Sequence, residues 1–128
     1  MAEKPRRKKI LIADDEADVL KVLAYELSKN GYDVVTAVDG EEALTMISQH
    51  LPDLILLDNK MPRLDGDQVC KRIKADPRLK SIRVIFITAS SHLGTPQLMH
   101  EIHADDCVIK PYESKELLSK VKKLLKES

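Results

Sequence analysis

Short apolar runs alternate with helix-spaced apolar residues along nearly the whole chain, and this alternation restricts the fold more than any other feature. The runs that read as strands are Ile10–Ala13, Val34–Val35, Leu54–Leu57, Val84–Ile87 and Cys107–Ile109. Between them, apolar residues recur at intervals of three and four, as on one face of a helix. Apolar strands separated by helices are typical of a parallel sheet covered on both faces. The sequence therefore predicts a doubly wound α/β domain with five parallel strands and five helices.

The first two helices are predicted from their periodicity and their end signals. Four residues spaced i, i+3, i+4 and i+7 form the buried stripe of the first helix: Leu20, Leu23, Ala24 and Leu27. Gly31 suits the position just after this helix ends. Asp39 with Glu42 three residues later resembles a capping box and predicts the start of the second helix, which ends before Pro52.

The remaining helices are predicted in the second half of the chain. A third helix is expected from about Asp67 to Asp76, because Pro77 ends it. A fourth is expected between Thr88 and Cys107 with Pro96 in its first turn, and its inward candidates are Leu98, Met99 and Ile102. The fifth is expected from about Ser114, where leucine and valine residues form a clear amphipathic stripe.

Composition indicates one small domain. The 128 residues include 21 Lys and Arg and 21 Asp and Glu, so the net charge of zero provides no attraction to nucleic acid or to a membrane surface. No apolar stretch approaches membrane length, and we expect a cytoplasmic protein. Cys70 and Cys107 match no metal-binding spacing and are predicted to be reduced packing residues. We expect a basic tail over residues 1–8 and a single domain over residues 9–128.

Polar residues suited to phosphoryl chemistry follow four of the five runs. Asp14 and Asp15 follow the first run, Asp58 the third, Thr88 the fourth and Lys110 the fifth. The carboxyl ends of parallel strands lie along one edge of a sheet, so these side chains are expected to meet there. Carboxylates about 4 Å apart repel by roughly 4 kcal/mol per pair at an effective dielectric of 20. Such a cluster requires a cation, and oxygen ligands alone indicate Mg²⁺.

The same residues carry a family resemblance. The motifs, in chain order, are Asp14-Asp15-Glu16, Leu56-Leu57-Asp58, Met61-Pro62, Asp65-Gly66, Ile87-Thr88-Ala89 and Lys110-Pro111-Tyr112. Together they resemble the receiver domain of two-component response regulators, and the likeness extends from about Lys8 to Lys126. The resemblance implies a flavodoxin-like sheet with strand order 2-1-3-4-5.

The resemblance also implies how the acidic residues act. Asp58 would be the nucleophile that accepts a phosphoryl group from a histidine kinase or phosphotransfer protein. Asp14, Asp15 and Asp58 would hold Mg²⁺ together with the backbone carbonyl of Lys60. The protein would be a phosphoacceptor with Mg²⁺-dependent autophosphorylation and autodephosphorylation, and not an enzyme in the usual sense.

Thr88 and Lys110 would be the switching residues. Lys110 would contact Asp58 at rest and a phosphoryl oxygen afterwards, while the Thr88 hydroxyl would bind that oxygen only in the modified state. A cis bond before Pro111 would aim Lys110 inward. The output surface for a downstream protein would be formed by the fourth helix, the last strand and the fifth helix.

Several positions depart from the common receiver pattern, among them His103, which stands where a glycine is common. Cys107 stands where the family usually has an aromatic residue that turns inward on activation, so coupling through such a ring is in doubt. Lys60 and Ser90 occupy positions that tune phosphoryl lifetime. Neither side chain is suited to orienting an in-line water, which predicts a long-lived phosphorylated state.

Alternative interpretations remain open. Asp14 or Asp15 can also be read as a cap of the first helix, and Thr88 as an ordinary strand residue. The chain can be a stand-alone signalling module or a receiver fragment of a larger multidomain regulator. An enzyme or flavin carrier on the same sheet is disfavoured, because the first strand is followed by two carboxylates and not by a Gly-rich phosphate loop. Lys60 also stands where an Asp-x-Asp phosphatase needs an acid.

Overall fold

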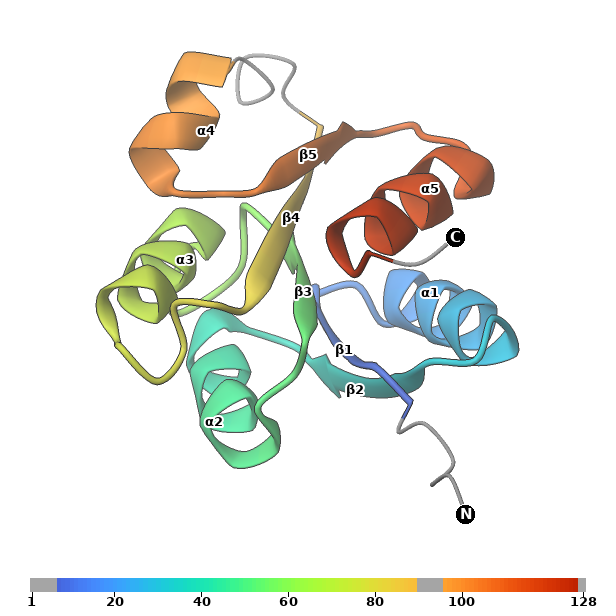
Figure 1. The fold of residues 1–128 in the computed structure, drawn as a ribbon, viewed down its shortest axis with the longest axis horizontal. Coiled ribbons are helices and arrows are strands. Elements are labelled where there is room, and N and C mark those ends of the chain that lie inside the picture. The colour runs from blue at the N-terminus through green and yellow to red at the C-terminus, as the bar shows by residue number, and fades with distance from the viewer. Residues whose placement is uncertain (1–6, 90–95, 127–128) are drawn as a thin grey trace.

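Strands and helices alternate strictly along the chain (Figure 1). The computed structural model describes residues 7–89 and 96–126. The strands are β1 Lys9–Ala13, β2 Asp33–Ala37, β3 Leu54–Asp58, β4 Arg83–Thr88 and β5 Asp106–Ile109. The helices are α1 Ala17–Lys29, α2 Gly40–His50, α3 Gly66–Ala75, α4 Pro96–Ile102 and α5 Ser114–Leu124. All strand pairs are parallel in the order β2-β1-β3-β4-β5, which confirms the predicted fold class and strand order.

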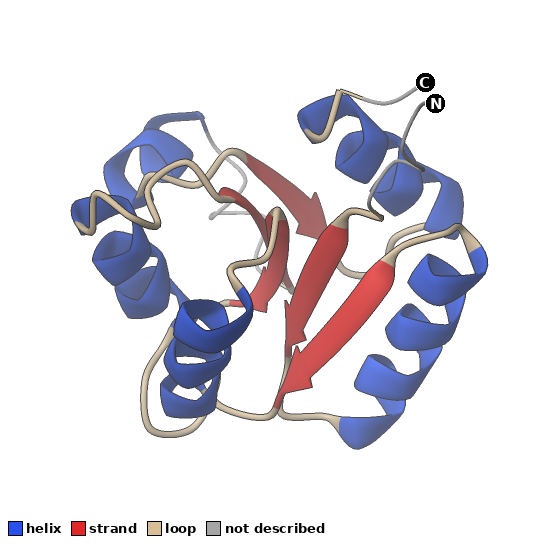
Figure 2. Ribbon diagram, turned by 60° about the horizontal axis from the view of Figure 1, so that its bottom comes forward, coloured by secondary structure: helices blue, strands red, loops and turns tan. Residues whose placement is uncertain are grey.

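The sheet separates two hydrophobic cores. Helices α1 and α5 cover one face, while α2, α3 and α4 cover the other (Figure 2). Alternate residues of each central strand point to opposite cores, so that Leu54 and Leu56 face α1 and α5 while Ile55 and Leu57 face the other helices. Every residue of β3 is therefore buried, whereas the edge strand β2 is only partly covered. This difference explains why β2 has the weakest apolar run.

The predicted signals at the ends of α1 and α2 are confirmed. Gly31 has φ of 94°, a left-handed conformation that glycine adopts without strain. The amides of Gly31 and Tyr32 donate to the carbonyls of Ser28 and Leu27, which is a Schellman motif. At the start of α2, Asp39 Oδ1 accepts a hydrogen bond of 2.8 Å from the amide of Glu42.

Two predicted helix starts need correction. Glu16 occupies the N-cap position of α1 without a side-chain cap hydrogen bond, and the Asp14 carboxylate accepts from the Glu16 amide instead of from an amide inside the helix. The capping role considered for Asp14 or Asp15 is therefore wrong. Helix α3 begins at Gly66, one residue before the predicted start, because Asp65 is its N-cap.

Some predictions fall outside the described part of the chain. Met99 packs against the core beneath α2 and α3, as predicted. The side chains of Leu98 and Ile102, the residue Ser90 and residues 1–6 of the predicted basic tail lie outside the described residues. Among the described helices the longest has 13 residues, and none combines the length and hydrophobicity that a membrane crossing requires.

Both cysteines are free and buried, as predicted for packing residues. Cys70 is fully buried, and this burial raises the pKa of its thiol to about 12. Cys107 lies on β5 opposite Phe86 of β4, and burial raises its pKa as well. A thiol that stays protonated at neutral pH is a poor nucleophile, so both residues contribute packing instead of reactivity.

Lys74 of α3 connects its helix to the segment before β4 and to the residue before β5. Its ammonium donates to the carbonyl of Ile82 at 2.6 Å and of Lys80 at 3.3 Å, and it pairs with Asp105 at 3.1 Å. The Asp105 carboxylate also accepts from the amide of Val84 at 2.8 Å. The Lys74 side chain is only 15% exposed, so these partners depend on it in place of water.

Lys74→Met is expected to lower the free energy of unfolding by about 2 kcal/mol, because it leaves buried acceptors without their charged donor. Urea unfolding followed by circular dichroism measures the change. The control is Lys71→Met, at an exposed position of the same helix, where a change within about 0.5 kcal/mol is expected. Equal effects of the two variants would show that the Lys74 contacts add nothing to stability.

Candidate acidic metal site

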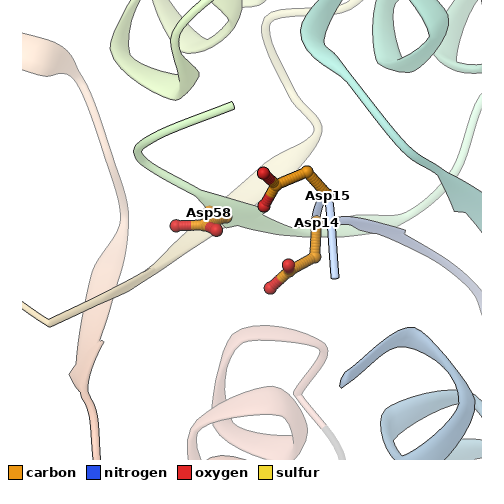
Figure 3. A group of neighbouring side chains, drawn as sticks. All are labelled: Asp14, Asp15 and Asp58. Carbon is orange, nitrogen blue, oxygen red and sulfur yellow. The ribbon is translucent and has the colours of Figure 1, made fainter. Parts of the chain in front are cut away.

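Three carboxylates meet at the carboxyl edge of the sheet (Figure 3). Asp14 and Asp15 directly follow β1, and Asp58 is the last residue of β3. The two strands are paired with Ala13 opposite Leu57, so their ends lie side by side. One carboxylate oxygen from each residue lies within 4.8 Å of the other two. The juxtaposition predicted from the strand ends is therefore present.

The cluster is unfavourable for negative charge. Asp14 is 2% exposed and Asp58 is 9% exposed, whereas Asp15 is open to solvent. Burial is the main cause that raises the pKa of Asp14. Burial likewise raises the pKa of Asp58, and the neighbouring charge of Asp14 raises it further. The folded protein thus maintains partly desolvated carboxylates that a cation would stabilise.

Nearby donors compensate part of this charge. The amide of Glu16 donates to Asp14 Oδ1 at 2.8 Å, and the amide of Lys60 donates to Asp58 Oδ1 at 3.3 Å. The ammonium of Lys110 lies 3.8 Å from Asp14 Oδ2 and 4.0 Å from Asp58 Oδ2. A single lysine charge thus faces two carboxylates, and it opposes part of the rise that burial causes in the pKa of each, which stays above its ordinary value.

The ends of β4 and β5 place Thr88 and Lys110 beside each other. Thr88 is 1% exposed at the end of β4, one residue beyond the partner of Asp58 in the sheet register. Its carbonyl accepts a hydrogen bond of 2.7 Å from the amide of Lys110. The Lys110–Pro111 bond is cis, as predicted. Lys60 lies in the exposed loop after β3.

The donor set fits Mg²⁺. Among the described residues, carboxylate oxygens and one lysine converge here, and hard divalent cations prefer oxygen. Ligands on opposite sides of Mg²⁺ lie about 4.2 Å apart, since each bond is about 2.1 Å. The carboxylate oxygens lie within 4.8 Å of one another, at most about 0.6 Å beyond that limit, so a small side-chain movement would bring all three onto one ion. Water molecules, which Mg²⁺ commonly retains, can complete the coordination.

Sequence reasoning missed two close approaches around the loop that follows Asp58. A Cβ on Gly66 would overlap the backbone of Asp58, and a Cβ on Gly40 would overlap the carbonyl of Leu64. In the sequence, Asp39 of the dipeptide Asp39-Gly40 indicates a helix cap, and Asp65-Gly66 is only part of a family motif. Nothing local in either dipeptide indicates the backbone segment that packs against it.

A sheet of this order with an acidic pocket at its carboxyl edge defines a class of signalling domain, and sequence comparison agrees. Residues 10–122 match the family described as "Response regulator receiver domain". The chain belongs to this family. A receiver domain is a phosphoacceptor and not a classical enzyme.

Individual relatives are similar over nearly the whole chain. The alkaline phosphatase synthesis transcriptional regulatory protein PhoP of Bacillus subtilis is 40% identical over 94% of this chain and 50% of that protein. The chain spans about half the length of the curated relatives it matches.

Two solved structures are also similar. Response regulator TrrA of Thermotoga maritima, crystallised with Mg²⁺ and BeF, has a TM-score of 0.82 at 38% identity and covers 91% of this chain and 98% of its own. A chain of the CheX–CheY–BeF₃–Mg²⁺ complex of Borrelia burgdorferi has a TM-score of 0.81 at 30% identity. That match covers 92% of this chain and 89% of the other.

Proposed function

We propose that this protein is a phosphorylation-activated receiver that accepts a phosphoryl group on Asp58 from a histidine kinase or phosphotransfer protein. The position of Asp58 supports this proposal most directly. Its carboxylate lies within 4.8 Å of the Asp14 and Asp15 oxygens and 4.0 Å from the Lys110 ammonium. An acidic nucleophile beside a cation site and a fixed positive charge is the arrangement that phosphoryl transfer requires. The Mg²⁺- and BeF-containing relatives support this assignment.

The reaction follows from these positions. An oxygen of the Asp58 carboxylate attacks the phosphorus of a phosphohistidine, the phosphorus–nitrogen bond breaks, and the released imidazole takes a proton. The product is an acyl phosphate on Asp58. Mg²⁺, held by Asp14, Asp15, Asp58 and the Lys60 carbonyl, would supply positive charge to the phosphoryl oxygens. Attack of water on the same phosphorus returns free phosphate and the carboxylate.

Lys110 and Thr88 would convert the modification into a structural change. The ammonium of Lys110, shared at rest between Asp14 and Asp58, would move to a phosphoryl oxygen. The hydroxyl of Thr88 would gain a contact with the phosphoryl group that the unmodified state lacks, and such a differential contact shifts a conformational equilibrium. The affected surface would be α4, β5 and α5, because β5 ends at this edge of the sheet and α4 and α5 follow the strands that end there. A downstream output protein would bind there.

The domain bounds and the cellular location are part of the same proposal. Residues 9–128 would form the receiver and residues 1–8 a basic tail, acting in the cytoplasm where a kinase can reach Asp58. Because the chain spans only half of PhoP, a receiver fragment of a larger regulator is the second candidate. The full-length gene distinguishes a stand-alone module from such a fragment.

Incubation with Mg²⁺ and acetyl phosphate tests the proposed function. We expect the intact mass to rise by one phosphoryl group, and the gain to disappear when a chelator removes Mg²⁺. Reduction of the acyl phosphate with borohydride, followed by peptide mapping, should place the modification at Asp58. No mass gain from either acetyl phosphate or phosphoramidate, or a gain at another residue, would contradict the proposal.

A further inference from the structure

The loop between β3 and α3, residues 59–65, follows Asp58 directly and contains Lys60. At its far end, the amide of Gly66 donates to the carbonyl of Asn59 at 3.0 Å. In its middle, Met61 is 7% exposed and packs into the core between the sheet and α2 and α3. These contacts hold the loop on the side of α3 and of the core.

The opposite side of the loop rests on the N-terminus of α2. The amide of Gly40, the first residue of α2, lies 3.4 Å from the carbonyl oxygen of Pro62. A Cβ on Gly40 would overlap the carbonyl oxygen of Leu64 and come within 2.8 Å of its carbonyl carbon. Only glycine allows the helix and the loop backbone to approach this closely.

Asp39 and Arg63 add a side-chain link across the same contact. Asp39 caps α2 through Oδ1, and its other oxygen, Oδ2, lies 3.4 Å from Nε of Arg63. Arg63 has φ of 73°, a left-handed conformation that is unfavourable for a residue with a side chain. A residue keeps such an unfavourable conformation where its neighbours hold it in place. On the side of α2, the neighbours of the loop that contains Arg63 are Asp39 and Gly40.

We infer that Gly40 is a positioning residue for the metal site, assisted by Asp39. The close approach at Gly40 sets the place of the loop, and the loop sets the place of the Lys60 backbone beside Asp58. The second step is visible in the hydrogen bond of 3.3 Å from the Lys60 amide to Asp58 Oδ1. Through this connection the start of α2 controls Mg²⁺ affinity without contacting the metal. The inference rests on the proposed function, in which the Lys60 carbonyl is a ligand.

A purely structural role for Gly40 makes a different prediction. If the glycine serves packing alone, Gly40→Ala lowers stability and leaves the Mg²⁺ affinity of the folded protein unchanged. Gly31→Ala is the matched control, because Gly31 has φ of 94° and no heavy atom of the described residues beyond its chain neighbours lies within 4 Å of an added Cβ. An alanine there is strained by its backbone alone, at the end of α1 remote from the acidic cluster.

The test is a calorimetric Mg²⁺ titration of folded Gly40→Ala, Gly31→Ala and the parent protein. We expect the dissociation constant of Gly40→Ala to rise about tenfold, the low end of the effects seen when groups that orient metal ligands are altered. Gly31→Ala should keep the parent affinity despite its lower unfolding midpoint. With acetyl phosphate, the Mg²⁺ concentration for half-maximal phosphorylation of Gly40→Ala should rise by the same factor, while the rate at saturating Mg²⁺ is retained.

Asp39→Ser provides a milder second variant. Serine preserves the N-cap acceptor for α2 and removes the carboxylate that faces Arg63. We expect roughly threefold weaker Mg²⁺ binding, because the Arg63 side chain is largely exposed and such ion pairs are weak. If Gly40→Ala does not fold, the Mg²⁺ affinity of Asp39→Ser tests the inference instead. Unchanged Mg²⁺ affinity in the folded variants overturns the inference, whereas a parent protein that binds no Mg²⁺ overturns the metal site of the proposed function.

Discussion

Asp58→Asn is expected to gain no phosphate from acetyl phosphate, while the parent protein gains one. The amide cannot form the acyl phosphate, because its nitrogen and its carbonyl oxygen are both far weaker nucleophiles than a carboxylate oxygen. Intact mass spectrometry after equal incubation measures the difference. We expect a complete loss, because the substitution removes the carboxylate oxygen that attacks phosphorus and the amide does not replace it.

The same substitution is expected to raise the thermal unfolding midpoint in the absence of Mg²⁺. Burial and the charge of Asp14 raise the pKa of Asp58, so the ionised carboxylate is less favourable in the folded state than in the unfolded state at neutral pH. A neutral amide removes that cost. A lower midpoint would show that Asp58 contributes to stability through contacts that outweigh its desolvation.

Asp33→Asn is the matched control for both measurements. Asp33 is exposed and begins β2, at the opposite edge of the sheet from the acidic cluster. This variant should accept one phosphate like the parent and unfold at nearly the same temperature. Phosphorylation of Asp58→Asn at the parent level would show that the phosphoacceptor is a different residue.

Mg²⁺ affinity is expected to fall at least tenfold in each of Asp14→Asn and Asp15→Asn. A unit charge about 4 Å from a cation interacts by roughly 4 kcal/mol at an effective dielectric of 20, and about 1.4 kcal/mol already corresponds to tenfold. Calorimetric titration measures both variants. Mg²⁺ should also raise the unfolding midpoint of the parent protein, because binding to the folded state alone stabilises it.

The control for the metal site is again Asp33→Asn, which should keep the parent affinity. The exposed position of Asp15 makes its variant the more informative one, since a change there is the least able to disturb the core. Parent-level Mg²⁺ affinity in Asp15→Asn would exclude this carboxylate from the coordination. Parent-level affinity in both variants would place the metal elsewhere.

Most of the site could be predicted because its residues follow directly after apolar runs, at or just beyond the ends of the strands. An apolar run such as Leu54–Leu57 is visible in the sequence, and the polar residue that follows it is placed by chain connectivity alone. The first residues of the strands were less visible in the sequence. Four strands, β1, β2, β4 and β5, begin one residue before the apolar run, because an exposed or partly exposed first position accepts a polar side chain; these first residues are Lys9, Asp33, Arg83 and Asp106.

Chain-local patterns by themselves determined the alternation of strands and helices, the cap at Asp39, the stop at Gly31 and the residues that end at the carboxyl edge. Strand order came from the family resemblance and not from periodicity. Only the tertiary structure decided that Lys74 joins α3 to Asp105 and that Gly40 packs against the carbonyl of Leu64. Hydrophobic periodicity depends on residues a few positions apart. These other features depend on backbone and charged groups that come together only when the helices have packed onto the sheet.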